Sequence, residues 1–481
     1  MSNPRRAEVR DKYSGEVIGE VAQDTRRDLR AKIRRAFQAR EAVRRTSLEQ
    51  RAELGRGVAR RLEARRAEFE ELMVREGGQP RKFARWELAR ALATAASLER
   101  RLELLKPREL PAASGRNILY REPYGVVGVL PPRNTPLVVP LYTMLAALGA
   151  GNAVVEKPSR LAPLICQRVV QLVLEAGCPA EAAQFSTCPG EEAAWEFIEN
   201  PEVDVLVQYA SSPVGKDNLI KMGSSLQKTK TTRGAGMLRV EGRMKKYVPE
   251  LAGNDPFVVL ESADLKQAAA AGLLGGYAHG GQLCIAAKRY LVQRPAASEF
   301  RERLIEGIRG LKVGDPGREE TDIGPIGKHE SLDVATHQVE EALERGGRLL
   351  IGGRADGAFF HPTLVEFEKT QILGAREEEK PFLWTEESFA PVRSLVVFDT
   401  LEEAVALAND SAYGLGASIF GDPERATLIA RRLAAGRVVI NEGPLYGDWA
   451  LPIGGIRDSG LNGSTDKIEE MTYTKRVHLA T

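Results

Sequence analysis

The stretch 280–289, GGQLCIAAKR, carries the side chain with the clearest chemical potential, a single cysteine between paired glycines and a Lys-Arg step. A thiolate is a strong nucleophile, and glycines let the backbone approach a substrate closely. Most cysteines, however, are small apolar residues that fill a core. The decapeptide alone therefore leaves two interpretations of Cys284 open, a catalytic thiol and a buried structural residue.

The composition is that of a globular protein, with 43% hydrophobic and 28% charged residues. At 481 residues the chain is too long for one ordinary core, so two or three domains are expected. Its 68 basic and 66 acidic side chains nearly cancel, which argues against nucleic-acid or anionic-lipid partners. Four cysteines without a CxxC pair fit neither a disulfide framework nor a zinc site. No metal is expected, and without a readable signal segment we expect a cytoplasmic location.

Residues 24–105 are expected to be helical, because apolar side chains recur every three or four positions from Leu48 to Leu72. The stretch 47–50, SLEQ, matches a capping box at a helix start. Arginine clusters also occur in this region. The interleaved glutamates and the apolar spacing favour a solvated helix face over a nucleic-acid surface.

From residue 125 onward, short β-branched runs alternate with helical patterns, which is typical of parallel sheets covered by helices. The expected strands are 125–130, 152–157, 203–209, 256–260, 289–293, 394–398 and 437–441. Two such series predict two α/β domains. The uncharged stretch 136–155 is long enough for a membrane span. Its prolines and glycines instead favour a buried helix that leads into a strand, so no membrane contact is expected.

Six short motifs occur in an order and spacing that resemble the NAD(P)-dependent aldehyde dehydrogenase superfamily. They are LPPRNTP (130–136), NAVVEKPS (152–159), PELAGNDP (249–256), GGQLC (280–284), EESFAPV (386–392) and PIGGIRDSG (452–460). The resemblance covers nearly the whole chain and implies an α/β fold in three parts. These are a Rossmann-like cofactor domain (1–107 and 124–251), an α/β catalytic domain (252–443) and a β oligomerisation arm (108–123 and 470–481).

The resemblance assigns three catalytic residues. Cys284 occupies the position of the family's nucleophile, and Asn134 matches the amide that stabilises an oxyanion together with the backbone N–H of Cys284. Glu250 matches the general base that activates the thiol and then a water molecule. A free thiol is only a few per cent ionised at neutral pH, so the site must help to form the thiolate. None of the other three cysteines falls on a family motif, and we expect Cys166, Cys178 and Cys188 to be structural.

The resemblance also implies a site for NAD or NADP. Its expected contacts are Lys157, Ser159 and Arg160 near the adenine ribose, Ser211 at the phosphates, and Glu387 and Phe389 at the nicotinamide ribose and ring. No GxGxxG occurs in the chain, but the family departs from that fingerprint. Arg160 stands where NAD-preferring relatives often carry a glutamate. Because a guanidinium favours a 2′-phosphate, both cofactors stay open.

Three positions depart from the family pattern. Arg133 replaces an aromatic residue beside Asn134, which affects the shape or charge of the substrate channel. Ala252 replaces a glycine near the general base, a change expected to stiffen the turn. Tyr209 and Ala210 replace the Thr-Gly step before the phosphate-binding serine.

The implied reaction is the oxidation of an aldehyde to a carboxylic acid through a thiohemiacetal and a thioester on Cys284. The segment 441–452 is expected to line the substrate mouth with Tyr446 and Trp449, which would favour aromatic or alkyl aldehydes. Two alternatives remain. A CoA-acylating relative would pass the thioester to CoA, although the presence of Glu250 favours water. A catalytically silent binding or assembly protein would have no reason to keep Cys284, Asn134 and Glu250 together.

The resemblance further implies that 108–122 and 471–480 pair in an arm that reaches a neighbouring subunit, in a homodimer or homotetramer. An exposed strand needs such a partner. The stretch 224–246 is longer than the family needs, and it is basic and glycine-punctuated. We expect a solvent-exposed loop there, with a lid over the cofactor phosphates or a partner contact as the alternatives.

Overall fold

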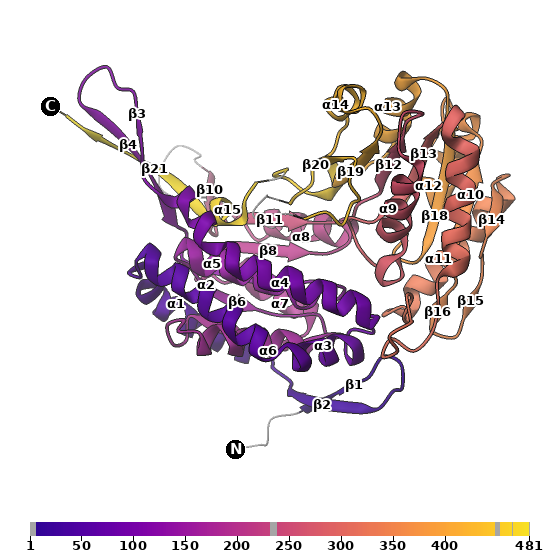
Figure 1. The fold of residues 1–481 in the computed structure, drawn as a ribbon. Helices are drawn as coiled ribbons and strands as arrows, with labels where there is room; N and C mark the ends of the chain where they lie inside the picture. The colour runs from indigo at the N-terminus through magenta and orange to yellow at the C-terminus, as the bar shows by residue number, and fades with distance from the viewer. Residues whose placement is uncertain (1–5, 231–237, 448–452, 464, 481) are drawn as a thin grey trace.

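The structure, a computed structural model, describes residues 6–230, 238–447, 453–463 and 465–480. Two sheets with their helices lie side by side, and a thin three-stranded arm projects away from the first (Figure 1). The expected α/β fold is confirmed. None of the helices in the described ranges is long and apolar enough to cross a membrane.

Helices fill the region before the first sheet, as the apolar spacing predicts. After the hairpin of β1 (Arg6–Arg10) and β2 (Val17–Ala22) come α1 (Arg26–Arg44), α2 (Leu48–Ala64), α3 (Arg66–Arg75), α4 (Arg81–Leu102) and the short η1 (Glu103–Leu105). The expected capping box forms at α2. The backbone N–H of Gln50 donates to Ser47 Oγ at 3.2 Å, and Gln50 Oε1 accepts from the Ser47 N–H at 2.8 Å.

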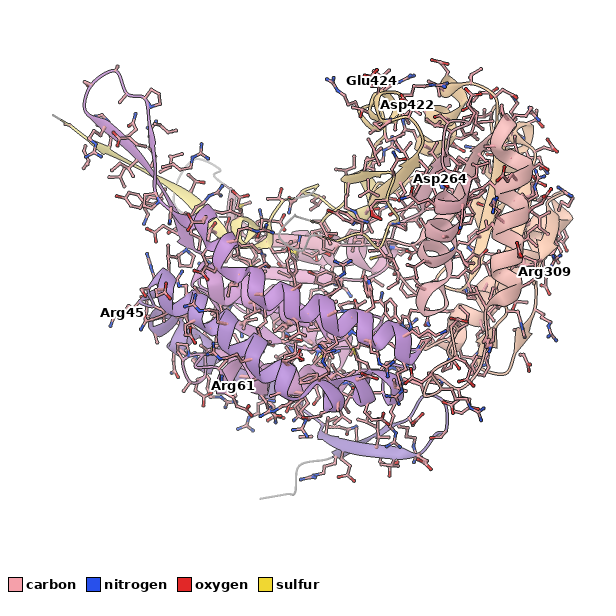
Figure 2. All side chains as sticks on the ribbon, in the orientation of Figure 1. Arg45, Arg61, Asp264, Arg309, Asp422 and Glu424 are labelled. Atoms are coloured by element: carbon pink, nitrogen blue, oxygen red, sulfur yellow. The ribbon has the colours of Figure 1, made fainter. Side chains whose placement is uncertain are left out.

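Charged side chains at the helix ends complement the helix dipoles, as the labelled residues of Figure 2 illustrate. Asp264 and Asp422 are N-caps that accept from the backbone N–H of Gln267 and Arg425, and Glu424 lies in the first turn of its helix. Arg61 and Arg309 lie in last turns. These interactions stabilise the ends of the helices.

The first sheet is parallel and has five strands. Its order is β11 (Lys246–Glu250), β8 (Val205–Tyr209), β5 (Val126–Leu130), β6 (Ala153–Glu156) and β7 (Ala183–Phe185). The connecting helices are α5 (Val138–Ala150), α6 (Pro163–Glu175), α7 (Gly190–Glu199) and α8 (Ser212–Ser224). The uncharged stretch 136–155 is thus a buried helix followed by a strand, as predicted. One continuous apolar core surrounds this sheet.

The second sheet has seven strands and an apolar cluster on each face. Its order is β14 (Arg348–Ile351), β17 (Thr363–Phe367), β18 (Val392–Phe398), β13 (Ala287–Gln293), β12 (Asp255–Val259), β19 (Gly416–Phe420) and β20 (Arg437–Ile440); only the β14–β17 pair is antiparallel. The remaining elements here are α9 (Leu265–Tyr277), η2 (Ala278–Gly281), α10 (Arg294–Gly310), α11 (His329–Glu344), β15 (Ala355–Asp356), β16 (Phe359–Phe360), η3 (Lys369–Gln371), η4 (Glu377–Glu379), α12 (Phe382–Thr385), α13 (Leu401–Asn409), α14 (Pro423–Ala430) and η5 (Arg457–Ser459). The domain boundaries expected at 107, 124, 251 and 443 stay a prediction.

Residues 251–254 link β11, the last strand of the first sheet in chain order, to β12 of the second sheet. In the parallel first sheet, Glu250 pairs with Tyr209, and Leu130 pairs with Gln208, so β5, β8 and β11 all end at the same edge. In the second sheet, Asp255 pairs with Ala287, so β12 and β13 start together. The carboxyl edge of one sheet therefore faces the amino edge of the other.

The arm consists of β3 (Arg108–Leu110), β4 (Arg116–Pro123) and β21 (Thr472–Leu479), which follows α15 (Lys467–Glu470). The predicted pairing of 108–122 with 471–480 is confirmed within this chain, because β21 runs antiparallel to β4 from Thr472 opposite Pro123 to Leu479 opposite Arg116. The stretch 224–246 was expected to be a loop, and this is wrong in part. It contains an antiparallel hairpin of β9 (Gln227–Lys230) and β10 (Leu238–Glu241).

Gly128, in the middle strand of the first sheet, offers a test of this packing. An added Cβ would lie 2.8 Å from Cδ1 of the buried Phe197. We expect Gly128→Ala to lower the free energy of unfolding by about 1–3 kcal/mol, because overpacking a core forces its neighbours to move. Gly223→Ala, in open space on α8, is the control and should leave stability unchanged or slightly raised. Equal melting temperatures for Gly128→Ala and the wild type would contradict this packing.

Candidate active site

A cavity of about 470 Å³ lies between the two sheets. The three predicted catalytic residues line it together, although they come from different elements: Asn134 follows β5, Glu250 ends β11, and Cys284 precedes β13. Ser159, Ser211, Glu387 and Phe389 line the same cavity. Lys157 and Arg160 do not line it. They follow directly after β6, on either side of Ser159.

The backbone before Cys284 takes an unusual course that turns the thiol toward the cavity. His279, Gly280 and Gly281 all have left-handed φ, at 52°, 64° and 70°. At Gly281 a Cβ would lie 2.5 Å from the carbonyl oxygen of Ala390, so only glycine fits there. The paired glycines of the motif are therefore required by the turn. Buried His279 stacks on Phe83 with ring centroids 4.9 Å apart and holds the turn from behind.

Cys284 is partly exposed, whereas the other three cysteines are buried. Its sulfur makes no hydrogen bond to any residue that the structure describes. Burial raises the pKa of the Cys284 thiol to about 12; the Lys288 ammonium opposes this shift, and the nearby carboxylates add to it. The thiol is thus neutral at rest, and its ionisation requires a base or an added positive charge.

Asn134 is held by hydrogen bonds that fix its amide beside the cysteine loop. Its Nδ2 donates to the backbone carbonyl of Gln282 at 2.8 Å, and the backbone carbonyl of Asn134 accepts from Gln79 Nε2 at 3.1 Å. An amide nitrogen has two hydrogens. The second is available to donate to an oxyanion formed at Cys284.

Gln282 is a functional residue that the sequence reasoning did not single out. Its Oε1 accepts from Arg133 Nη1 and from the Gly327 N–H, both at 2.9 Å. Its backbone carbonyl holds Asn134. The signal was its place in the motif GGQLC, which the resemblance used only for the glycines and the cysteine.

Glu250 lies at the carboxyl end of β11, and its carboxylate forms an ion pair with the Lys467 ammonium. Burial raises the pKa of Glu250 to about 7, while Lys467 lowers it. A carboxyl group that titrates near neutrality suits a general base. Lys467 was not predicted, because the stretch STDKIEE has the pattern of an exposed charged turn.

Several of the predicted cofactor residues have a fixed position or an unused hydrogen-bond donor, which suits the binding of a dinucleotide. Glu387 accepts from the Gly253 N–H at 3.0 Å and lies 3.3 Å from Lys288 Nζ. The Lys157 ammonium is buried and forms no hydrogen bond or ion pair with a described residue. Ser211 is the N-cap of α8 but makes no side-chain capping bond, so the N–H groups of Ser212 and Val214 in the first turn are not capped by it; Pro213 between them has no N–H.

Two further predictions concern the rim of the cavity. Arg133 stacks over Phe389, with its Cζ 5.5 Å from the ring centroid, so its charge lies at the end of the cavity that holds the predicted nicotinamide residues. Tyr446 is 48% exposed and is not among the residues that line the cavity. Trp449 lies outside the described residues.

Comparison with known proteins gives a consistent result. The family model described as "Aldehyde dehydrogenase family" matches residues 1–477. A lactaldehyde dehydrogenase from Methanocaldococcus jannaschii is 30% identical over 98% of this chain and 96% of its own length. A benzaldehyde dehydrogenase [NAD(+)] from Pseudomonas putida is 31% identical over 98% of this chain and 93% of its own length.

Solved structures agree in fold. The crystal structure of glyceraldehyde-3-phosphate dehydrogenase GapN from Methanocaldococcus jannaschii, complexed with NADP, matches with a TM-score of 0.88 and 28% identity. The match covers 100% of both chains.

Alkylation of the native protein distinguishes Cys284 from the other cysteines. We expect iodoacetamide to modify Cys284 first, and faster as the pH rises, because it alone is partly exposed. Burial raises the pKa of all four thiols, to about 12 for Cys284 and Cys178 and to about 11 for Cys188, so accessibility and not ionisation separates them. Peptide mapping by mass spectrometry gives the site. Labelling of Cys166 or Cys188 at the rate of Cys284 would refute the placement.

Proposed function

We propose which residues of this chain are catalytic and which class of aldehyde it accepts. The chain belongs to the aldehyde dehydrogenase family and oxidises an aldehyde to a carboxylic acid with NAD(P)+. The proposal assigns Cys284 as the nucleophile, Asn134 as an oxyanion ligand and Glu250 as the general base. It is supported above all by one observation: all three side chains line the same cavity, although they lie far apart in the sequence.

In the first step the Cys284 thiol gives its proton to Glu250, which passes it on to solvent, and the resulting thiolate attacks the aldehyde carbon. The carbonyl oxygen becomes an oxyanion that accepts hydrogen bonds from Asn134 Nδ2 and the backbone N–H of Cys284. Removing one such donor typically costs about 2.7–4 kcal/mol of barrier. Gln282 supports this step indirectly, because it holds the Asn134 amide against the cysteine loop.

When bound, NAD(P)+ supplies the hydride acceptor that converts the thiohemiacetal into a thioester, and its positive ring favours the thiolate. Lys157, Ser159, Arg160, Ser211, Glu387 and Phe389 are the residues that would hold it. The Lys157 ammonium, which is buried without a described partner, supports a polar ligand at this end.

In the last step Glu250 removes a proton from water, and the oxygen attacks the thioester carbon. The C–S bond breaks, the carboxylic acid leaves, and the Cys284 thiolate takes up the proton from Glu250 to return to the thiol. The carboxyl group must be ionised for this role. Its pKa of about 7, raised by burial, makes hydrolysis fall as the pH drops below neutrality.

The wall of the cavity beside Cys284 supports apolar aldehydes as substrates. Leu283 and Ile285, which flank the cysteine, belong to an apolar cluster with Trp86, Phe83 and Leu445. Trp86, Leu283 and Ile285 line the cavity itself. Of the cavity's carboxylates, Glu250 and Glu387 are each paired with a lysine. A charged aldehyde would therefore lose its hydration against an apolar wall.

We also propose that the arm of β3, β4 and β21 pairs with a neighbouring subunit in a homodimer or homotetramer. Its exposed strands and the exposed side chains Tyr473 and Leu479 support such a contact. A cytoplasmic location stays a prediction.

A panel of aldehydes with NAD+ and NADP+ tests the substrate class. We expect kcat/KM for benzaldehyde and hexanal to exceed that for succinic semialdehyde and glyceraldehyde 3-phosphate by about tenfold or more, because an apolar wall cannot solvate a charge. The expected product is the free carboxylic acid, formed without added CoA. A preference for the charged aldehydes would contradict the proposed substrate class, and a strict requirement for CoA would contradict hydrolysis by Glu250.

A further inference from the structure

Lys467 is a buried lysine, and among the described residues its ion-pair partners are two glutamates. Its side chain is 1% exposed, and its ammonium contacts the carboxylates of Glu250 and Glu470, the latter at 2.9 Å. It also lines the cavity that holds Cys284. A lysine this deeply buried loses its hydration, so it stays charged only with partners such as these.

The short helix α15 holds Lys467 in place. Asp466 caps the helix by accepting from the Ile468 N–H at 2.8 Å. It also accepts two hydrogen bonds from the buried Arg101 of α4, at 3.0 and 2.8 Å. On the other side, Glu469 pairs with Arg121 of β4 at 2.6 Å. Because Asp466 and Glu469 are both held by arginines, the backbone of α15 is fixed, and the Lys467 ammonium has little freedom to move away from Glu250.

We propose that Lys467 is a positioning residue, which holds the Glu250 carboxylate by an ion pair in the orientation from which it activates water. This inference rests on the proposed function, in which Glu250 is the general base. Lys467 does not touch the reacting atoms. It acts through Glu250. Because the positive ring of bound NAD(P)+ also favours the Cys284 thiolate, the loss of Lys467 slows acid release more than thioester formation.

The charges around Glu250 give this role a signature in the pH profile. Lys467 and Glu470 of α15, Tyr209 of β8, Tyr142 of α5 and Cys284 are the titratable groups that face it. Burial keeps the thiol and both phenols neutral, and Glu470 opposes ionisation of Glu250. Lys467 is the group that favours ionisation. Without it the pKa of Glu250 rises, and the acid limb of hydrolysis moves to higher pH.

Lys467→Met, Lys467→Arg and Glu250→Gln are compared with the wild type, with Lys106→Met as the matched control on the surface. Single-turnover formation of reduced cofactor and the rate of acid release are measured separately across pH, with the melting temperature of each variant. For Lys467→Met we expect acid release to fall by about 10- to 100-fold, within the range of general-base catalysis. Its acid limb should move to higher pH, and Lys467→Arg should recover most of the rate. Lys106→Met should behave as the wild type.

The outcomes separate this inference from the function on which it rests. If Glu250→Gln releases acid at the wild-type rate, the proposed general base is wrong. If Glu250→Gln blocks release while Lys467→Met keeps the wild-type rate and pH profile, the inference alone is overturned. An equal slowing of both steps in Lys467→Met, with a lower melting temperature and an unmoved acid limb, would show a purely structural role and also overturn it.

Discussion

The constraint on which this site depends is the meeting of two sheet edges. Parallel strands place their carboxyl ends along one edge, so the ends of β5 and β11 carry Asn134 and Glu250 to the same side of the first sheet. The short link 251–254 then brings the amino edge of the second sheet against it. Cys284 lies at that edge, just before β13, and the cavity forms where the edges face each other.

Burial governs the chemistry inside this cavity. It raises the pKa of Cys284 and of Glu250, and so keeps a neutral thiol beside a carboxyl group that titrates near neutrality. Two lysines offset the free-energy cost of burying these carboxylates. Lys288 contacts Glu387 and the cysteine loop, and Lys467 contacts Glu250. The buried charges of the site therefore remain compensated.

Local patterns and motif order predicted the helical region 24–105, the pairing of the arm and seven strands, namely β5, β6, β8, β12, β13, β18 and β20, but not β7, β11, β14, β17 or β19. Of the predicted site residues, Asn134, Glu250 and Cys284 line one cavity, whereas Lys157 and Arg160 do not. The patterns did not predict Gln282 or Lys467, because the roles of these residues depend on contacts between distant segments. Lys467 reaches Glu250 only after α15 is fixed by Arg101, which lies on a helix more than three hundred positions away in the sequence. The hairpin of β9 and β10 was missed because its basic, glycine-containing sequence is typical of a loop.

The most direct test of the convergence of these residues is to trap the acyl-enzyme. Glu250→Gln protein is mixed with NAD(P)+ and benzaldehyde, and its intact mass and peptide map are recorded. We predict a gain of one benzoyl group, located on Cys284, because the positive ring of bound NAD(P)+ still favours the thiolate, so thioester formation proceeds, more slowly, while hydrolysis is blocked. No added mass despite formation of reduced cofactor, or an acyl group on any other residue, would contradict the account.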